Sequence, residues 1–124
     1  MPKALGLALD AALICLFAAI GRRNHGETAA LLAVATTAWP FLAGMTAGWV
    51  VSVLATGRVP LTVRDGIPIW LGAVAIGMAL RSLTHAGTAL SFIVVATLFL
   101  GVMLLGWRAV AAVVTSRLVH KPAS

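Results

Sequence analysis

Residues 28–57, TAALLAVATTAWPFLAGMTAGWVVSVLATG, form a run of thirty residues without a charged side chain. An α-helix rises about 1.5 Å per residue, so roughly 20 apolar residues are enough to cross a hydrocarbon layer about 30 Å thick. The run is therefore long enough to form a membrane-spanning helix. Three further apolar stretches fill most of the remaining chain, and together they predict a membrane protein with several spans.

We expect four spans, at residues 4–21, 29–55, 67–83 and 88–107, with the last helix extending to about 118. The connecting segments are short, which favours antiparallel neighbours in a compact bundle. The predicted fold is an all-α integral membrane four-helix bundle in up-down-up-down order. We expect residues 1–124 to form a single transmembrane domain.

A weak internal similarity suggests that the bundle consists of two repeated helical hairpins. Four residues recur at a displacement of sixty positions: His25, Thr28, Ala29 and Thr37 correspond to His85, Thr88, Ala89 and Thr97. Two hairpins with the same orientation would be related by a pseudo-two-fold axis along the membrane normal. Chance similarity in a chain rich in Ala and Leu is the competing explanation.

The composition excludes a water-soluble fold. The 124 residues are 61% hydrophobic and 10% charged, whereas an ordinary soluble domain is about 25% charged. The formal charge of +6 would suggest nucleic acid in a soluble protein. Here the basic residues lie between apolar runs, where they set orientation and meet anionic lipid headgroups. We therefore expect the lipid bilayer, and not nucleic acid, as a partner.

The distribution of basic residues predicts the orientation. With four spans, the side that holds both termini and the 56–66 loop carries six Lys and Arg, against three on the other side. Excess Lys and Arg remain in the cytoplasm, so we expect both termini there. Trp49, Trp70 and Trp107 then fall near the cytoplasmic boundary, where indole rings favour the headgroup level.

Asp10 is an acidic residue inside the first apolar stretch, where a carboxylate is costly unless it is paired, protonated or hydrated. Gly6, Asp10 and Phe17 share one helix stripe, which should point into the bundle. Arg108 in the last span is expected at the same depth. We predict a buried ion pair between Asp10 and Arg108, and the alternative is a role for Asp10 in coupling to protons or ions.

A second group of charges is expected at the opposite, outer side. Arg81 shares a helix face with Ala73 and Gly77, and small residues usually mark the packed side. With Arg22, Arg23 and His25 of the first connection, Arg81 suggests an anion-binding pocket, because guanidinium binds carboxylate and phosphate bidentately. The alternative is a solvated loop of anchoring charges.

The second span contains features of close helix packing. Gly44 and Gly48 form a small-xxx-small pattern, which permits close approach within the chain or between two copies. Pro40 should kink the helix near mid-membrane. Trp39 is expected near mid-depth, as a packing residue or the wall of a pocket. A kink of this kind can also shape a cavity or gate, as in transporters, but packing is the favoured explanation.

Four motifs carry a resemblance to a known family: FAAIGRRNHGE at 17–27, TAWPFLAGMTAGW at 37–49, GIPIWLGAVAIGMALR at 66–81 and LLGWR at 104–108. In these motifs the chain resembles the small bacterial and archaeal membrane proteins catalogued as domain of unknown function 3054. The resemblance implies a multi-pass protein of the prokaryotic cell membrane. It implies no substrate, reaction or catalytic residue.

Two functions are compatible with these observations, and we favour the first because Asp10 and Arg81 both lie on packed faces. The first is a small permease-like or ligand-binding protein that handles an anionic solute or lipid headgroup, and it requires a hydrated cavity between the helices. The second is a structural or accessory subunit that binds another membrane protein or forms a homodimer, and it requires a dry bundle. We expect no enzyme activity, cofactor or metal, because the sequence has no convincing nucleophile–base pair, phosphate loop or specific metal-ligand spacing.

Overall fold

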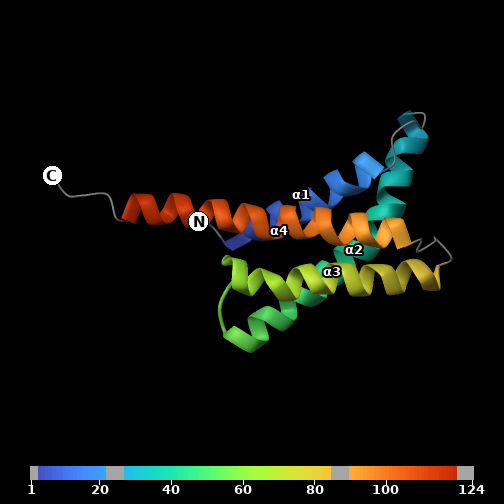
Figure 1. Ribbon diagram of the computed structural model, residues 1–124. Helices are drawn as coiled ribbons and strands as arrows, with labels where there is room; N and C mark the ends of the chain where they lie inside the picture. The colour runs from blue at the N-terminus through green and yellow to red at the C-terminus, as the bar shows by residue number, and fades with distance from the viewer. Residues whose placement is uncertain (1–2, 22–26, 85–89, 120–124) are drawn as a thin grey trace.

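The structure is a computed structural model that describes residues 3–21, 27–84 and 90–119. These residues form four α-helices and no strand: α1 (Lys3–Gly21), α2 (Glu27–Thr56), α3 (Val63–Leu83) and α4 (Leu90–Val119) (Figure 1). The all-α fold predicted from the sequence is confirmed. The N-terminal end of α1, the α2–α3 connection and the C-terminal end of α4 lie at the same end of the molecule (Figure 1), which we call the ion-pair end.

The helices pack in a ring in which each contacts two others. Contacts join α1 to α2, α2 to α3, α3 to α4 and α4 back to α1, and those between α2 and α3 are the most extensive. Within the described ranges, no comparable backbone contact joins α1 to α3 or α2 to α4. The C-terminal part of α4 projects past the other three helices (Figure 1).

Three helices are long and apolar enough to cross a membrane, over Val34–Thr56, Val63–Leu83 and Leu90–Leu118. The apolar part of α1, Ala4–Ile20, is shorter. Since α1 has 19 residues, its length is about 28 Å, just below the thickness of the hydrocarbon core. A membrane location is therefore supported by three helices, and a fourth crossing by α1 remains a prediction.

Helix α3 begins one turn earlier than the sequence predicts. The expected span began at 67, with Pro68 in its first turn, but the helix begins at Val63 and Pro68 lies inside it. The reason is the N-cap, because the Thr62 side chain accepts a hydrogen bond from the backbone N–H of Asp65 at 3.1 Å. This pairing satisfies one of the free donors at the start of the helix.

The core is formed by inward-facing residues at spacings of three and four, as amphipathic helix packing requires. All four phenylalanines meet there: the ring of Phe17 lies 5.4 Å from Phe41, 6.0 Å from Phe92 and 5.5 Å from Phe99, centroid to centroid. Such aromatic contacts add to the stability that burial alone gives. The middle of the described bundle is thus filled by aromatic and aliphatic side chains.

Glycines bring α2 and α3 into backbone contact. A Cβ added to Gly44 would collide with the backbone oxygen of Gly72, and one added to Gly48 would lie 2.6 Å from the Cα of Ile69. The small-xxx-small pattern of α2 therefore faces α3 of the same chain. This surface is not available to a second copy while the described fold is intact.

Pro40 is buried inside α2, and the helix changes direction partway along its length (Figure 1). A proline removes one backbone hydrogen bond and commonly causes such a bend. Trp39 was expected to be a packing residue or the wall of a pocket, but its side chain is 44% exposed. With its neighbours Ala38 and Pro40 buried, the side chain at position 39 faces out of the bundle.

The two helical hairpins, α1–α2 and α3–α4, are similar in helix length but differ in the positions of their charged residues. Helices of 19 and 30 residues form the first, and helices of 21 and 30 residues form the second. The positions sixty residues from Asp10 and Arg108 are Trp70 and Gly48, so the charged residues are not duplicated. Several members of the repeated pattern, including His25 and His85, lie outside the described residues.

Candidate functional site

The structure joins Asp10 of α1 directly to Arg108 of α4, 98 residues later in the sequence. The guanidinium binds the carboxylate bidentately, with Nη1 2.8 Å from Oδ1 and Nη2 2.7 Å from Oδ2. Both side chains have 0% exposure. Because a buried charge without a partner is costly, this bidentate geometry explains how two charges are accommodated inside an apolar bundle.

Two tryptophans complete the environment of the carboxylate. The indole Nε1 of Trp49 donates to Oδ2 of Asp10 at 2.8 Å, and that of Trp107 donates to Oδ1 at 2.8 Å. Each carboxylate oxygen thus accepts one guanidinium and one indole N–H. An ionised carboxylate has about four acceptor positions, so all of them are occupied by side chains of this chain.

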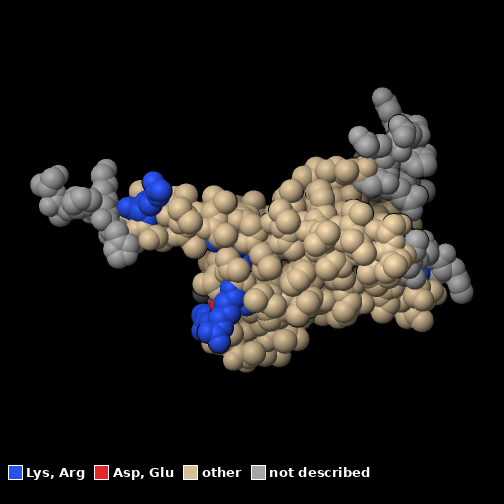
Figure 2. Space-filling view, in the orientation of Figure 1, with Lys and Arg blue, Asp and Glu red and all other residues tan. Residues whose placement is uncertain are grey.

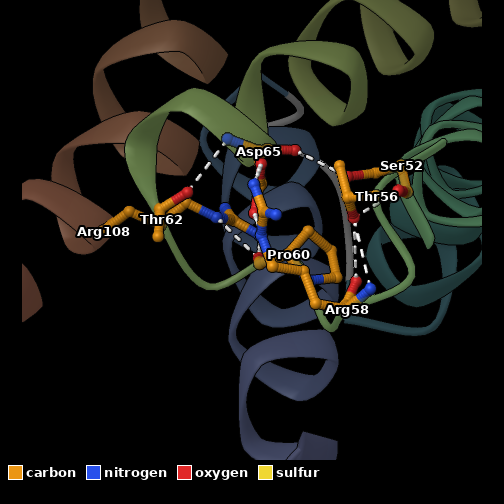
Figure 3. A network of polar contacts seen from close by, with 7 residues as sticks. All are labelled: Ser52, Thr56, Arg58, Pro60, Thr62, Asp65 and Arg108. Atoms are coloured by element: carbon orange, nitrogen blue, oxygen red, sulfur yellow. Dashed lines mark hydrogen bonds and ion pairs between the residues drawn. The ribbon is translucent and has the colours of Figure 1, made fainter.

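The guanidinium of Arg108 is equally well satisfied. Besides Asp10, its Nη1 donates to the carbonyl of Leu104 at 2.7 Å, and its Nε and Nη2 donate to the carbonyl of Pro60 at 3.1 and 3.0 Å. Figure 3 shows Arg108 reaching Pro60 in the α2–α3 connection. Arginine has five N–H donors, and all five are used. The pair therefore links α1, α2, α4 and the α2–α3 connection.

The tryptophans correct an expectation about the membrane boundary. Trp49, Trp70 and Trp107 were expected to present their indoles to headgroups, but Trp49 and Trp107 donate to Asp10, and Trp70 donates to the carbonyl of Thr97 at 2.9 Å. An indole N–H that finds an acceptor inside a bundle no longer needs an interfacial one. These three rings therefore hold the helices together.

Two glycines make room for the network. A Cβ on Gly66 would lie 2.7 Å from Cδ of Arg108, and one on Gly6 would lie 2.6 Å from Leu61 and 3.6 Å from the rings of Trp49 and Trp107. A larger residue at either position would displace the arginine or the chain segments around the carboxylate. Gly6 was predicted on the Asp10 stripe, whereas the contact of Gly66 with Arg108 gave no sequence signal.

A second ion pair lies at the same end and was not predicted. The guanidinium of Arg58 binds Asp65 with Nε 2.7 Å from Oδ2 and Nη2 2.9 Å from Oδ1 (Figure 3). Asp65 is 3% exposed and Arg58 is 59% exposed. Through these hydrogen bonds and its charge, Asp65 holds the pKa of Arg58 above its ordinary value. The spacing of Thr62 and Asp65, typical of a helix N-cap, could have placed Asp65 in the first turn of α3, but it does not indicate Arg58 as its partner.

One further hydrogen bond joins the end of α2 to the start of α3, and a second lies within the last turn of α2. The Ser52 hydroxyl donates to the backbone carbonyl of Asp65 at 3.1 Å, and the Thr56 hydroxyl lies 2.7 Å from the carbonyl of Ser52 (Figure 3). In the described part of the chain, no buried side-chain nitrogen or oxygen lacks a hydrogen-bond partner. The buried polar groups of the ion-pair end are thus internally satisfied.

The predicted outer anion pocket is only partly visible. Arg81 is buried at 7% exposure, with its guanidinium 4.3 Å above the ring of Phe92. It lies on the predicted face, because Ala73 and Gly77 are also buried. The other proposed members, Arg22, Arg23 and His25, lie outside the described residues.

Three hollows of roughly 320 to 460 Å³ lie on the surface of the described structure. Their walls are almost wholly apolar. One of them runs between α1 and the projecting part of α4 and is lined by Leu9, Trp107, Val110, Ala111, Val114 and Thr115. Val110 is 64% exposed, which places this hollow on the outside of the bundle.

A family model described as "Protein of unknown function (DUF3054)" matches residues 7–111. The matched range includes Asp10 and the three residues that donate to its carboxylate. No curated protein and no solved structure matches the chain. The comparisons therefore supply family membership, and any function has to be argued from the geometry.

Proposed function

The chain belongs to the DUF3054 family, whose description assigns no activity, and we propose that it is a structural or accessory subunit of a membrane complex. In this proposal the four helices cross the cell membrane and both termini are cytoplasmic. The excess of Lys and Arg at the ion-pair end supports that orientation. The protein then acts by binding a membrane partner, and it has no catalytic role.

The observation that carries the proposal is the saturation of the Asp10–Arg108 network. A carboxylate that couples transport to protons or ions needs a free acceptor position and access to water. Asp10 has 0% exposure, and its oxygens accept four hydrogen bonds from Arg108, Trp49 and Trp107. The charges inside this bundle are used to join its helices.

The packing of the interior supports the same proposal. A solute pathway needs a polar, hydrated space between helices, whereas the described core is filled by the phenylalanine cluster and the aliphatic residues around it. The hollows have apolar walls and lie at exposed side chains. Leu98 and Val102 of α4, for example, are 64% and 66% exposed, which suits contact with lipid or with a partner helix.

Site-specific photo-crosslinking in native membranes tests the proposal. A photoreactive residue at Leu98, on the outer face of α4, should give a discrete adduct with a second polypeptide, which mass spectrometry identifies. The matched control is Leu100, two residues away with 0% exposure, which should give no intermolecular adduct. Exclusively lipid adducts at Leu98 and at Val51, which is 56% exposed on α2, would contradict an accessory role.

A second candidate, a protein that handles an anionic ligand, is favoured by one observation. Arg81 is a buried cation at the end opposite the ion pair, stacked on Phe92. Anionic metabolites or lipids that bind there should raise the melting temperature of the purified protein, because a ligand that binds the native state stabilises it. The shift should disappear in Arg81→Gln. No shift across a broad panel of anions would remove this candidate.

A further inference from the structure

We propose that the connection between α2 and α3 binds the phosphate of an anionic phospholipid through Arg58 and Arg64. This proposal goes beyond the accessory role and does not depend on it. It requires only that α2 and α3 cross the membrane. Both helices are long and apolar enough to do so, and the connection joins their ends, where lipid headgroups lie.

This surface keeps a net positive charge, because the ion pair with Asp65 offsets only one of its two arginines. Arg58 and Arg64 are exposed, whereas the acids of the same end, Asp10 and Asp65, are buried and already paired. Figure 2 shows basic side chains gathered at the ion-pair end, with only a small area of acidic atoms between them. A surface of this kind attracts anionic lipid, and each Lys or Arg near a membrane surface contributes to that attraction.

The two arginines have hydrogen-bond donors to spare. Arg58 uses Nε and Nη2 for Asp65, which leaves Nη1 and one N–H of Nη2 for a ligand. Arg64 makes no hydrogen bond or ion pair within the described residues. Guanidinium groups match the geometry of phosphate oxygens and bind them bidentately. A phosphate group would therefore find several free donors on one short segment.

The segment is held in place before any ligand binds. The carbonyl of Pro60 accepts two hydrogen bonds from buried Arg108, and the ion pair with Asp65 fixes the guanidinium of Arg58 (Figure 3). Gly57, with φ +71°, supplies the left-handed turn that leads out of α2. A ligand that binds a preformed segment loses less ordering entropy than one that must organise it.

An apolar hollow beside the connection favours a lipid over free phosphate. The last turns of α2 contribute Trp49, Val50, Val53 and Leu54 to a hollow of about 320 Å³, and Leu7 of α1 and Thr46 complete it. Leu54, four residues before Arg58, is 80% exposed. Acyl chains would cover this surface while the phosphate meets the arginines.

Native mass spectrometry of the full chain in a neutral detergent tests the proposal. Phosphatidylglycerol and phosphatidylcholine with identical acyl chains are compared, and the wild-type chain should retain phosphatidylglycerol preferentially. Arg64→Gln should weaken phosphatidylglycerol binding about fivefold, the effect of one surface arginine. Arg64→Gln removes no hydrogen bond or ion pair of the described residues, and Asp65 keeps its bidentate partner Arg58, so the fold should persist.

The matched control is Arg117→Gln, which makes the same change of charge at an exposed position on the projecting part of α4. It should change phosphatidylglycerol binding less than twofold. Equal retention of both lipids, or equal losses in Arg64→Gln and Arg117→Gln, would overturn the site. Displacement of the lipid by an equal concentration of inorganic phosphate would show that the arginines take phosphate alone, and would overturn the assignment to lipid.

Discussion

Replacing Asp10 by Asn isolates the contribution of the buried charge. Asn keeps one oxygen, which can accept two of the four hydrogen bonds, but its amide group presents donors to a guanidinium N–H and an indole N–H. Arg108 also keeps its charge at 0% exposure without a counter-ion. Removal of one partner from a buried ion pair costs about 3–5 kcal/mol. We expect Asp10→Asn to lower the free energy of unfolding by that amount.

The measurement is a double-mutant cycle with Arg108→Gln. The free energy of unfolding of each variant is obtained in mixed micelles with increasing denaturing detergent, and tryptophan fluorescence follows the loss of structure. In the double variant no charge is left unpaired, so part of the stability should return, with a coupling energy of about 2–3 kcal/mol. Additive losses within about 0.5 kcal/mol would refute the argument that the two charges stabilise the fold as a pair.

Two comparisons of single substitutions test the packing. Gly44→Ala should destabilise the fold by about 1–3 kcal/mol, because the new methyl group meets the α3 backbone. Gly106→Ala, where no atom lies within 4 Å of the new methyl group, should be neutral or stabilising by up to about 1 kcal/mol. Equal losses of stability in thermal or detergent unfolding would contradict the close contact of Gly44 with α3. Trp107→Phe should lower the free energy of unfolding by about 1.5–3 kcal/mol, because it removes a hydrogen bond to a charged carboxylate. Trp70→Phe should lower it by about 0.5–1.5 kcal/mol, because it removes a hydrogen bond to a neutral carbonyl. The reverse order in the same assay would contradict a special role for the Asp10 carboxylate.

The sequence predicts the helical fold and the residues of the ion pair, because the first depends on the length and periodicity of apolar runs and the second on the free-energy cost of a charge within such a run. A run of apolar residues with the length of a span requires a helix, and Asp10 and Arg108 are costly in such runs unless they meet. The helix stripes also place Gly44 and Gly48 on the packed face. These predictions need no knowledge of which loop or ring lies opposite each residue.

The rest of the network depends on tertiary contacts that have no pattern in the sequence. The carbonyl of Pro60 becomes an acceptor only because the α2–α3 connection folds over Arg108. Tryptophan near the end of a span usually faces headgroups, so the donation of Trp49 and Trp107 to a buried carboxylate was not expected. The exposed position of Trp39 follows from the rotation of α2 against α3, which the glycine contacts determine.

Hydrogen exchange of the indole N–H groups tests most directly whether the charged centre is closed and structural. The chain has four tryptophans, so ¹⁵N-labelled indoles give four signals that single Trp→Phe variants assign. After transfer to deuterated water, we predict slow exchange at Trp49 and Trp107, because both donate to the fully buried Asp10. Rapid exchange at these two indoles in the folded protein would show that water reaches the carboxylate, and would contradict a structural role for the ion pair.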